Sequence, residues 1–517
     1  MSKMEKPNDN PPATNIPDKR YRGYGMFEDP LVTEKNDKIE AGLQKKINAF
    51  YDTKRQREIY DFIIKHRPGK PVRVGRTIRG GYNAIFHLEY TDGAAALRVP
   101  LPGQNAFPDE KVRVEVATLR YIEKMTSIPV PHVYHWGTAA ENPLGLGPFI
   151  IMDYINHDKN LEDVLRDPAF GHEAGPLDPN IPRAKLKRLY RQVARIILQL
   201  SKLEMPKIGS LQQQGDSFII GSRPLTQDMN DLVVQGGIPP SILPPETATF
   251  STSAEWYAVL ADAHFAHLAF QRNDAINSAD DCRDKFVARH LFRQLLRRGK
   301  FGTPPPRRTK KESFPLCIED LRPHNILVDA NLNIVGVIDW EWAYFAPRAF
   351  AHDLPWWLLL QRYGSWSGSV LDFRDKYAKA LDVFLDALRA EEGLAAARQL
   401  DEGWSIDQHI EALSLDAVPL SEQMRRSWES GAFWANYAAR KCFGFEPVFW
   451  EFLDERFFGA NVEGGYEGRM NLLSAKAKKR MEWFVERKVE ESKERKIVDW
   501  DPEEARAYLA EILADLD

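Results

Sequence analysis

The sequence has little of three things that would narrow its function at once: cysteine, long apolar runs and net charge. Its three cysteines, Cys282, Cys317 and Cys442, lie far apart, which argues against a disulfide framework and a cysteine-rich zinc site. Apolar runs such as Phe149–Met152 and Pro355–Leu360 are much shorter than the roughly 18–20 residues that a spanning helix needs. We therefore expect a protein of a reducing compartment with no membrane span.

Charge and targeting signals are equally sparse. Lys and Arg number 70 against 74 Asp and Glu, a formal net charge of -4, so nothing electrostatic favours nucleic-acid binding. The first residues, Met1 to Asp18, carry acidic residues and prolines, unlike a secretory signal or an acid-poor presequence. We expect a cytoplasmic protein, and a mitochondrial location is not excluded.

The length of 517 residues, 43% of them hydrophobic, is enough for more than one core. The polar, proline-broken residues 1–36 predict a flexible tail. We expect two lobes: residues 37–152, where a helical pattern at residues 38–66 precedes strand signals, and residues 153–517, which are mostly helical.

The first lobe contains a β-rich segment with a glycine turn. Alternating runs at Ala84–Tyr90 and Ala94–Val99 flank Asp92-Gly93, which predicts a hairpin. Before them, Gly80 and Gly81 would let backbone N–H groups approach a phosphate. Their spacing matches no complete phosphate-loop motif, so a plain turn is the alternative.

A strand and the next helix contribute a pair of opposite charges. In the helix predicted at about residues 109–125, Glu115 shares the apolar face of Val112 and Leu119, so its carboxylate needs a cation. Arg98 on the preceding strand is the natural partner, in the position of a cation that orients ATP phosphates. An ordinary salt bridge between the two elements is the alternative.

Residues 316–341 carry the strongest chemical signal. Asn325 begins a short strand, residues 329–333 have turn chemistry, and a second strand ends at Asp339. Pairing would bring the Asn325 amide beside the Asp339 carboxylate, and hard oxygen ligands of this kind suit Mg²⁺. Asp320, in the loop ahead, would face a substrate hydroxyl as catalytic base. An Asp and an Asn at this spacing alone could be coincidence.

Between these regions we expect a hinge and an insertion. Phe149–Met152 is a buried-strand signal followed by Asp153 and Tyr154, where the composition turns helical. Residues 213–310 form a long helical and loop excursion before the hairpin.

With these motifs in this order, the chain resembles the aminoglycoside phosphotransferase and choline kinase-like branch of the protein-kinase-like fold, especially its large fungal members. The resemblance covers about residues 72–360. It implies an α+β fold with a small β-rich N-lobe and a large, mostly helical C-lobe, with ATP and Mg²⁺ as cofactors. By the same resemblance Asp320 is the catalytic base, and Asn325 and Asp339 bind the metal. The residues it assigns to the nucleotide are Gly80, Gly81, Arg98, Glu115, Met152, Asp153 and Tyr154.

The chain departs from the family pattern at several positions. Ile318 stands where the family usually has a histidine two residues before the catalytic Asp, which puts the bracing of that loop in question. Asp353 matches a family position that braces it. Arg98 replaces lysine, and Asp339-Trp340-Glu341 replaces the Asp-Phe-Gly of protein kinases.

The leading hypothesis is an ATP- and Mg²⁺-dependent phosphotransferase acting on a hydroxyl group of a small molecule. A non-catalytic nucleotide-binding scaffold that kept the fold is the alternative, and a protein kinase is disfavoured by the missing Asp-Phe-Gly. The sequence identifies neither the acceptor nor the oligomeric state.

Overall fold

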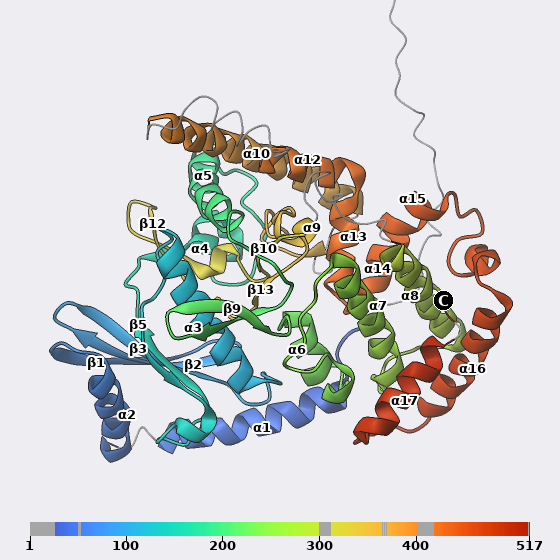
Figure 1. The fold of residues 1–517 in the computed structure, drawn as a ribbon, viewed down its shortest axis with the longest axis horizontal. Helices are drawn as coiled ribbons and strands as arrows, with labels where there is room; N and C mark the ends of the chain where they lie inside the picture. The colour runs from blue at the N-terminus through green and yellow to red at the C-terminus, as the bar shows by residue number, and fades with distance from the viewer. Residues whose placement is uncertain are drawn as a thin grey trace, which may run out of the picture.

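The computed structural model describes residues 26–49, 53–298, 312–363, 366, 368, 370–401, 418–514 and 516. An antiparallel sheet near the N-terminus adjoins a larger, mostly helical region (Figure 1). The predicted α+β architecture is therefore confirmed. Among the described residues, no helix has the length and apolar character to cross a bilayer.

The N-terminal sheet has five strands in the order β1-β2-β3-β5-β4, and neighbouring strands are antiparallel. The strands are β1 (Pro71–Arg79), β2 (Asn83–Tyr90), β3 (Gly93–Pro100), β4 (Val133–Gly137) and β5 (Phe149–Asp153). Tyr90 pairs with Gly93, which confirms the hairpin predicted there. Gly93 has a φ of 149°, a conformation that L-residues rarely adopt.

The two faces of this sheet pack against different helices. Helix α2 (Thr53–His66) covers one face, where Ile63, Leu97 and Ile151 belong to a small separate core. Helix α3 (Pro108–Met125) covers the other, where Val116 and Ile150 join the main core. The sheet thus separates two cores, and α3 connects it to the helical region.

The helical region is built around long amphipathic helices whose apolar sides meet in the main core. Aromatic side chains pack within it: Trp434 stacks on Phe452 with ring centroids 3.6 Å apart. Its α-helices are α4 (Leu161–Leu165), α5 (Arg183–Leu200), α6 (Gln227–Val234), α7 (Ser253–Phe270), α8 (Ala279–Arg297), α9 (Arg348–Ala351), α10 (Val370–Asp401), α12 (Leu420–Ser430), α13 (Ala432–Ala439), α14 (Phe445–Val448), α15 (Asp454–Phe458), α16 (Ala475–Glu491) and α17 (Pro502–Leu513).

Short strands form the predicted hairpin within this region. Strand β11 (Ile326–Val328) pairs with β12 (Ile334–Val337) and with β6 (Lys159–Asn160), and β10 (Phe314–Ile318) pairs with β13 (Ala343–Phe345) and β7 (Glu204–Met205). The predicted excursion contains part of the ribbon β8 (Ser210–Gln214) and β9 (Ser217–Ser222), then helices α6, α7 and α8. Its last residues, 299–310, lie outside the described residues.

The predicted flexible tail is wrong at its C-terminal end. Residues 1–25 lie outside the described residues, but helix α1 (Pro30–Ala49) begins within the range assigned to the tail. Asp29 explains this start. Its buried carboxylate accepts hydrogen bonds from the backbone N–H groups of Leu31 (3.0 Å) and Val32 (3.3 Å) and from the side chain and backbone of Asn273.

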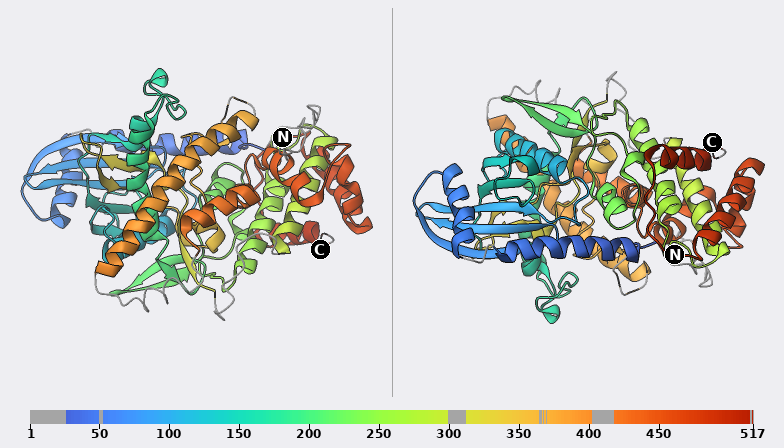
Figure 2. Two further views of the ribbon diagram at one scale, coloured as in Figure 1. Left: turned by 90° about the horizontal axis from the view of Figure 1, so that it is seen from above. Right: turned by 90° about the horizontal axis from the view of Figure 1, so that it is seen from below.

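Helix α1 runs across both parts of the molecule (Figures 1 and 2). Near its start, Asn36 donates to the carbonyl of Val234 in α6 (2.5 Å); one turn on, the Glu40 carboxylate binds Arg79 of β1 and Gln104. A Cβ on Gly103 would lie 2.4 Å from the Asn36 carbonyl oxygen, so glycine permits this close approach.

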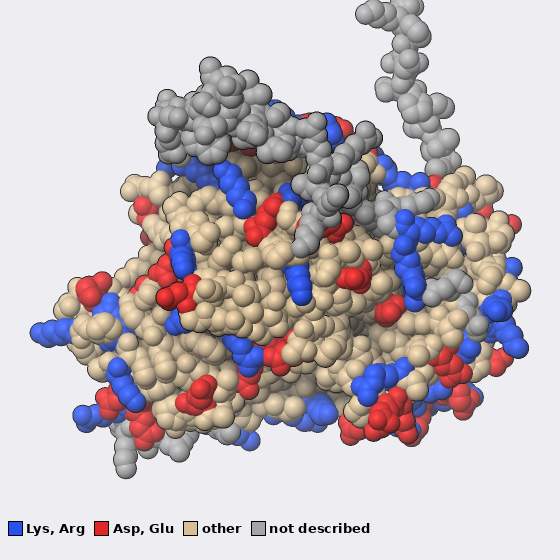
Figure 3. All heavy atoms as spheres, viewed as in Figure 1, with Lys and Arg blue, Asp and Glu red and all other residues tan. Residues whose placement is uncertain are grey.

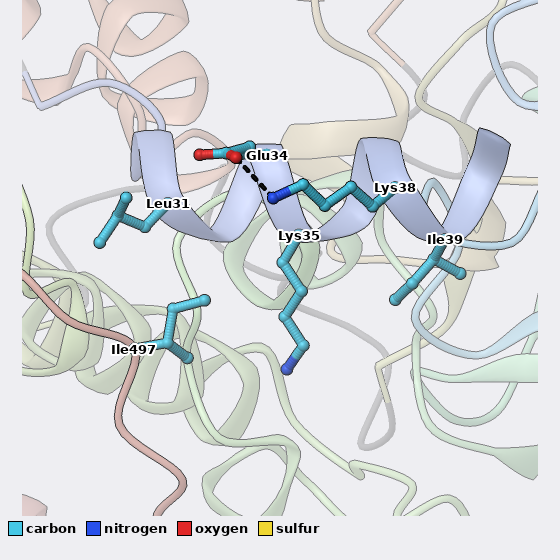
Figure 4. Close-up of a pocket in the computed structure, with 6 residues that line it drawn as sticks. All are labelled: Leu31, Glu34, Lys35, Lys38, Ile39 and Ile497. Atoms are coloured by element: carbon cyan, nitrogen blue, oxygen red, sulfur yellow. Dashed lines mark hydrogen bonds and ion pairs between the residues drawn. The ribbon is translucent and has the colours of Figure 1, made fainter. Parts of the chain in front are cut away.

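The remaining side of α1 faces an open groove (Figure 4). The groove encloses about 630 Å³ and is lined by Leu31, Glu34, Lys35, Lys38, Ile39 and Ile497. Glu34 and Lys38 pair along the helix at 2.6 Å and not with the opposite wall. Helix α1 is therefore held by its contacts to α6, Asn273 and the sheet.

Positive and negative side chains are interspersed over the face seen in Figure 3, with no extended field of one sign. This agrees with the near-zero balance of charges in the sequence.

We expect Asp29→Ala to loosen α1, because it removes an N-cap and leaves Asn273 without its buried acceptor. The loss should be about 2 kcal/mol locally. Amide hydrogen exchange across residues 30–49 should accelerate in Asp29→Ala and stay unchanged in the exposed control Asp37→Ala. Equal exchange in both variants would contradict the capping role.

Candidate active site

The hairpin of β11 and β12 brings Asn325 next to Asp339. Ile326 pairs with Val337, and the N–H of Ile338 donates to the carbonyl of Asn325 at 2.9 Å. The 3₁₀ turn η4 (Pro323–Asn325), begun by a proline, leads the chain from the Asp320 loop into β11. The hairpin therefore has the form that the turn chemistry of residues 329–333 predicted.

In the side-chain amide of Asn325, the nitrogen has hydrogen-bond partners and the oxygen has none among the described residues. Its Nδ2 donates to the backbone oxygen and to Oδ2 of Asp320, both at 2.9 Å, which fixes the orientation of the amide. Its Oδ1 is buried and has no hydrogen-bond partner among the described residues. A buried carbonyl oxygen without a donor is costly, and a cation would satisfy it.

Asp339 is held in an unusual conformation. Its φ of 59° is left-handed, which non-glycine residues rarely adopt and which costs of order 1–3 kcal/mol. Its side chain is 34% exposed, and Arg98 lies 3.2 Å from its Oδ1. Burial raises the pKa of Asp339, and the positive charge of Arg98 opposes that rise.

Arg98 forms the centre of a buried ionic cluster. Its side chain is 3% exposed; Nη1 lies 2.5 Å from Oε1 of Glu115, and Nη2 binds Oε2 of Glu341. The predicted pair of Arg98 and Glu115 is present, and it extends to two further carboxylates, those of Asp339 and Glu341. The planar guanidinium makes this possible, because its nitrogens reach several acceptors at once.

Sequence analysis missed Lys111, Glu341 and Asn83, which complete this cluster. Nζ of Lys111, on the first turn of α3, lies 2.8 Å from Oε2 of Glu341, and the Asn83 amide donates to the same oxygen at 3.1 Å. Burial alone would raise the pKa of Glu341, but Lys111 and Arg98 outweigh it and hold the pKa below its ordinary value. One signal was available: Lys111 stands one turn before Glu115 on the same helix face.

The glycine turn joins β1 to β2. It adjoins this cluster, because Asn83, two residues after Gly81, binds Glu341. Gly80 and Gly81 are exposed, neither has a positive φ, and a Cβ on Gly81 would meet nothing within 4 Å. The next residue, Tyr82, points toward the helical region: its hydroxyl accepts from Nε2 of Gln227 in α6 at 3.4 Å. Burial raises the pKa of Tyr82 to about 12, so its hydroxyl stays protonated.

The predicted hinge follows β5. Met152 lies within the sheet, while the N–H groups of Asp153 and Tyr154 donate to the carbonyls of His132 and Ala94, both at 2.9 Å. These two N–H groups are therefore occupied. Ile155 follows, and its N–H has no acceptor within the described part of the chain.

The loop that carries Asp320 is braced by Asp353 and Arg440, and not by a histidine at position 318. Ile318, Asp353 and Arg440 line the same small cavity of about 80 Å³. The Asp353 carboxylate accepts from Ser427 (3.0 Å) and from Nη2 of Arg440 (3.0 Å). Arg440 thus gives the buried Asp353 carboxylate a charged partner beside the apolar Ile318.

The Asp320 carboxylate has two polar partners, one at the start of the hairpin and one in its own loop. Besides the Asn325 amide, it has Arg322 Nε 3.1 Å from its Oδ1. Burial raises the pKa of Asp320, while Arg322, Asn325 and Arg362 act against the rise. The described residues contain no group of three or more His, Cys, Asp and Glu placed to hold a metal. A metal held here would therefore have at most two such residues as ligands, with other oxygens, such as Asn325 Oδ1, completing the set.

A sequence profile described as the phosphotransferase enzyme family matches residues 74–387. Over 162 residues the chain is 28% identical to "Altered inheritance of mitochondria protein 9, mitochondrial" of Candida glabrata, covering 30% of this chain and 25% of that protein. It is 24% identical over 157 residues to a subtelomeric hrmA-associated cluster protein of Aspergillus fumigatus, covering 30% and 28%. The matched segment thus spans little more than a quarter of these relatives.

Two solved structures are similar at low scores. A crystal structure of a putative aminoglycoside phosphotransferase from Ralstonia eutropha matches with a TM-score of 0.36 at 12% identity, covering 77% of this chain and 97% of that one. The aminoglycoside phosphotransferase APH(4)-Ia, crystallised with AMP-PNP and hygromycin B, matches with a TM-score of 0.37 at 14% identity, covering 76% and 97%.

We expect Arg98→Lys to destabilise the protein, because one ammonium group cannot bind Glu115 and Glu341 as the two ends of a guanidinium do. The loss should be about 1–3 kcal/mol, and Arg98→Met should cost more, about 3–5 kcal/mol, because it leaves buried carboxylates unpaired. Thermal unfolding of the two variants, with the exposed Arg374→Lys as control, measures this. Equal stability of Arg98→Lys and the parent would show that the two-ended guanidinium is not required.

Proposed function

The chain belongs to the phosphotransferase enzyme family, and on that premise we propose that it transfers the γ-phosphoryl group of ATP to a hydroxyl group of a small molecule. The observation that carries the proposal is the connection from Asp320 through the Asn325 amide to the hairpin end where Asp339 contacts Arg98. A base, two oxygen ligands and a phosphate-binding cation are the parts that this reaction uses.

Asp320 is proposed as the base. The acceptor oxygen forms a bond to the γ-phosphorus as the bond from that phosphorus to the β,γ-bridging oxygen breaks, and ADP leaves. The hydroxyl proton passes to the Asp320 carboxylate and from there to solvent. Asn325 and Arg322 hold the carboxylate in place, and such positioning supplies much of the acceleration in phosphoryl transfer.

Asn325 and Asp339 are proposed to hold Mg²⁺. The buried Asn325 Oδ1 without a donor and the partly exposed Asp339 carboxylate fit a hard cation. When bound, Mg²⁺ neutralises charge on the phosphates. Glu115 and Glu341 keep Arg98 oriented, and the exposed Gly80 and Gly81 are proposed to cover the phosphates.

The adenine base is proposed to lie at the end of β5. Met152 was predicted to contact it together with Asp153 and Tyr154, whose N–H groups are occupied by the sheet. The N–H of Ile155 would then be the donor to adenine. The cytoplasm is the proposed location, and the mitochondrion is the alternative.

One observation favours the rival function, a nucleotide-binding scaffold without catalysis. Both Nη atoms of Arg98 already contact carboxylates. A phosphate could contact Arg98 only if one of these carboxylates moved away from it.

We expect Asp320→Asn to lower phosphoryl transfer by about 10²–10⁴-fold, because the amide cannot accept the proton, while an ATP analogue still binds. The assay is ADP release with a panel of hydroxyl-bearing metabolites, and the exposed Asp375→Asn is the matched control. Turnover by Asp320→Asn at the parent rate would refute the catalytic role. An ATP analogue that binds without any acceptor being turned over would favour the scaffold.

The pH profile gives a separate test. Because burial raises the pKa of Asp320, the acidic limb of kcat/KM should lie above the ordinary Asp pKa of about 3.9, with activity lost as the pH falls and Asp320 is protonated. Arg322→Gln removes an opposing positive charge, so it should move this limb to higher pH. A limb that does not move would show that another group controls it.

A further inference from the structure

Two cations lie beside the catalytic loop and share a single neutral acceptor. Nη2 of Arg362 lies 3.4 Å and Nζ of Lys441 3.2 Å from the same Oε1 of Gln227. Both side chains are half-buried. Lys441 also attracts the nearby carboxylates of Asp228, Asp231 and Glu319. The oxygen that both cations contact, however, belongs to an amide without net charge, so at that point the two positive charges repel each other.

Gln227 connects this pair to the proposed site. It is the first residue of α6, and its backbone N–H donates to Oε2 of Glu319, the residue before Asp320, at 2.9 Å. Its Nε2 donates to Tyr82 of the glycine turn. The pair of cations therefore lies where the turn, α6 and the catalytic loop meet.

Arg362 packs close to the loop that carries Asp320. Its guanidinium carbon lies 4.5 Å from the ring centroid of Trp356, whose indole N–H donates to the carbonyl of Glu319 at 3.4 Å. Its charge is also near enough to Asp320 to oppose the rise of that pKa caused by burial.

The neighbouring carboxylates do not pair with these cations. Asp228 accepts from the backbone of Cys442 (3.0 Å), Asp231 from the Asn230 amide (3.3 Å), and Glu319 from Gln227. Within the described part of the chain, neither Arg362 nor Lys441 forms an ion pair with any carboxylate. Other cations near the site do: Arg98, Lys111, Arg223 and Arg440 each form at least one ion pair with a carboxylate.

We propose that the acceptor substrate carries an anionic group, a carboxylate or a phosphate, which Arg362 and Lys441 bind while its hydroxyl faces Asp320. The inference rests on the proposed phosphotransferase function and adds the substrate class: hydroxy acids or phosphorylated alcohols. The anion replaces the Gln227 amide as the shared partner of the two cations. Charge-assisted bonds of this kind are among the stronger ones that a protein makes to a ligand.

The test compares acceptors that differ only in charge. One arm pairs hydroxy carboxylates with their primary amides, and a second pairs phosphorylated diols with the corresponding free diols. ADP release at saturating ATP is measured for the full chain, for Arg362→Gln, Arg362→Lys and Lys441→Gln, and for the control Lys379→Gln, exposed on α10.

The parent should prefer the anionic member of a pair by at least about tenfold, and the preferred arm identifies the anion as carboxylate or phosphate. Arg362→Gln and Lys441→Gln should each raise the KM for the anionic acceptor by about 10- to 100-fold and reduce the preference, with kcat changed far less. Arg362→Lys keeps the charge and should recover part of the loss. Lys379→Gln should behave as the parent.

Two outcomes overturn the proposal in different ways. If the parent turns over neutral acceptors as well as anionic ones, or if the variants raise KM for both members equally, the anionic class is wrong and the phosphotransferase remains. If the parent releases no ADP with any acceptor, both proposals fall, and binding of an ATP analogue then separates a scaffold from a protein without a nucleotide site. Lys441→Gln decides the matter independently if Arg362→Gln does not fold.

Discussion

The structure depends on one buried set of charges, in which Arg98 and Lys111 face Glu115 and Glu341, with the partly exposed Asp339 at its edge. Removing charges from water costs several kcal/mol for each ion unless partners compensate, so these groups are stable only together. They come from β3, from α3 and from the segment after β12. The same contacts that orient the site therefore also fasten the sheet to the hairpin.

Short-range patterns in the sequence predicted the hairpin and the pair of Arg98 and Glu115. Turn chemistry and helix periodicity act over a few residues, so they can be followed along the chain. Glu341 was missed because its direction depends on how the segment after β12 crosses to β3, which no local spacing records. The roles assigned to Asp320, Asn325 and Asp339 remain predictions.

Helix α1 shows why the N-terminal boundary could not be predicted. Its attachment relies on polar contacts between distant residues, such as Asp29 with Asn273 and Asn36 with Val234. Neither pair leaves a periodic signal, and the prolines before it suggested a tail. The bracing of the Asp320 loop is another long-range contact. Beside Ile318, Asp353 is bound by Arg440, which lies 87 residues further along the chain.

The course of α1 has a mechanical consequence for the two lobes. The chain joins them once after β5, and α1 joins them a second time through its bonds to Asn273 and α6 at one end and to β1 at the other. The ionic cluster around Arg98 and the ion pair of Arg223 with Glu110 in α3 fasten the same two lobes at further places. Any movement of one lobe against the other would have to break some of these bonds, so α1 should act as a brace that resists such a movement.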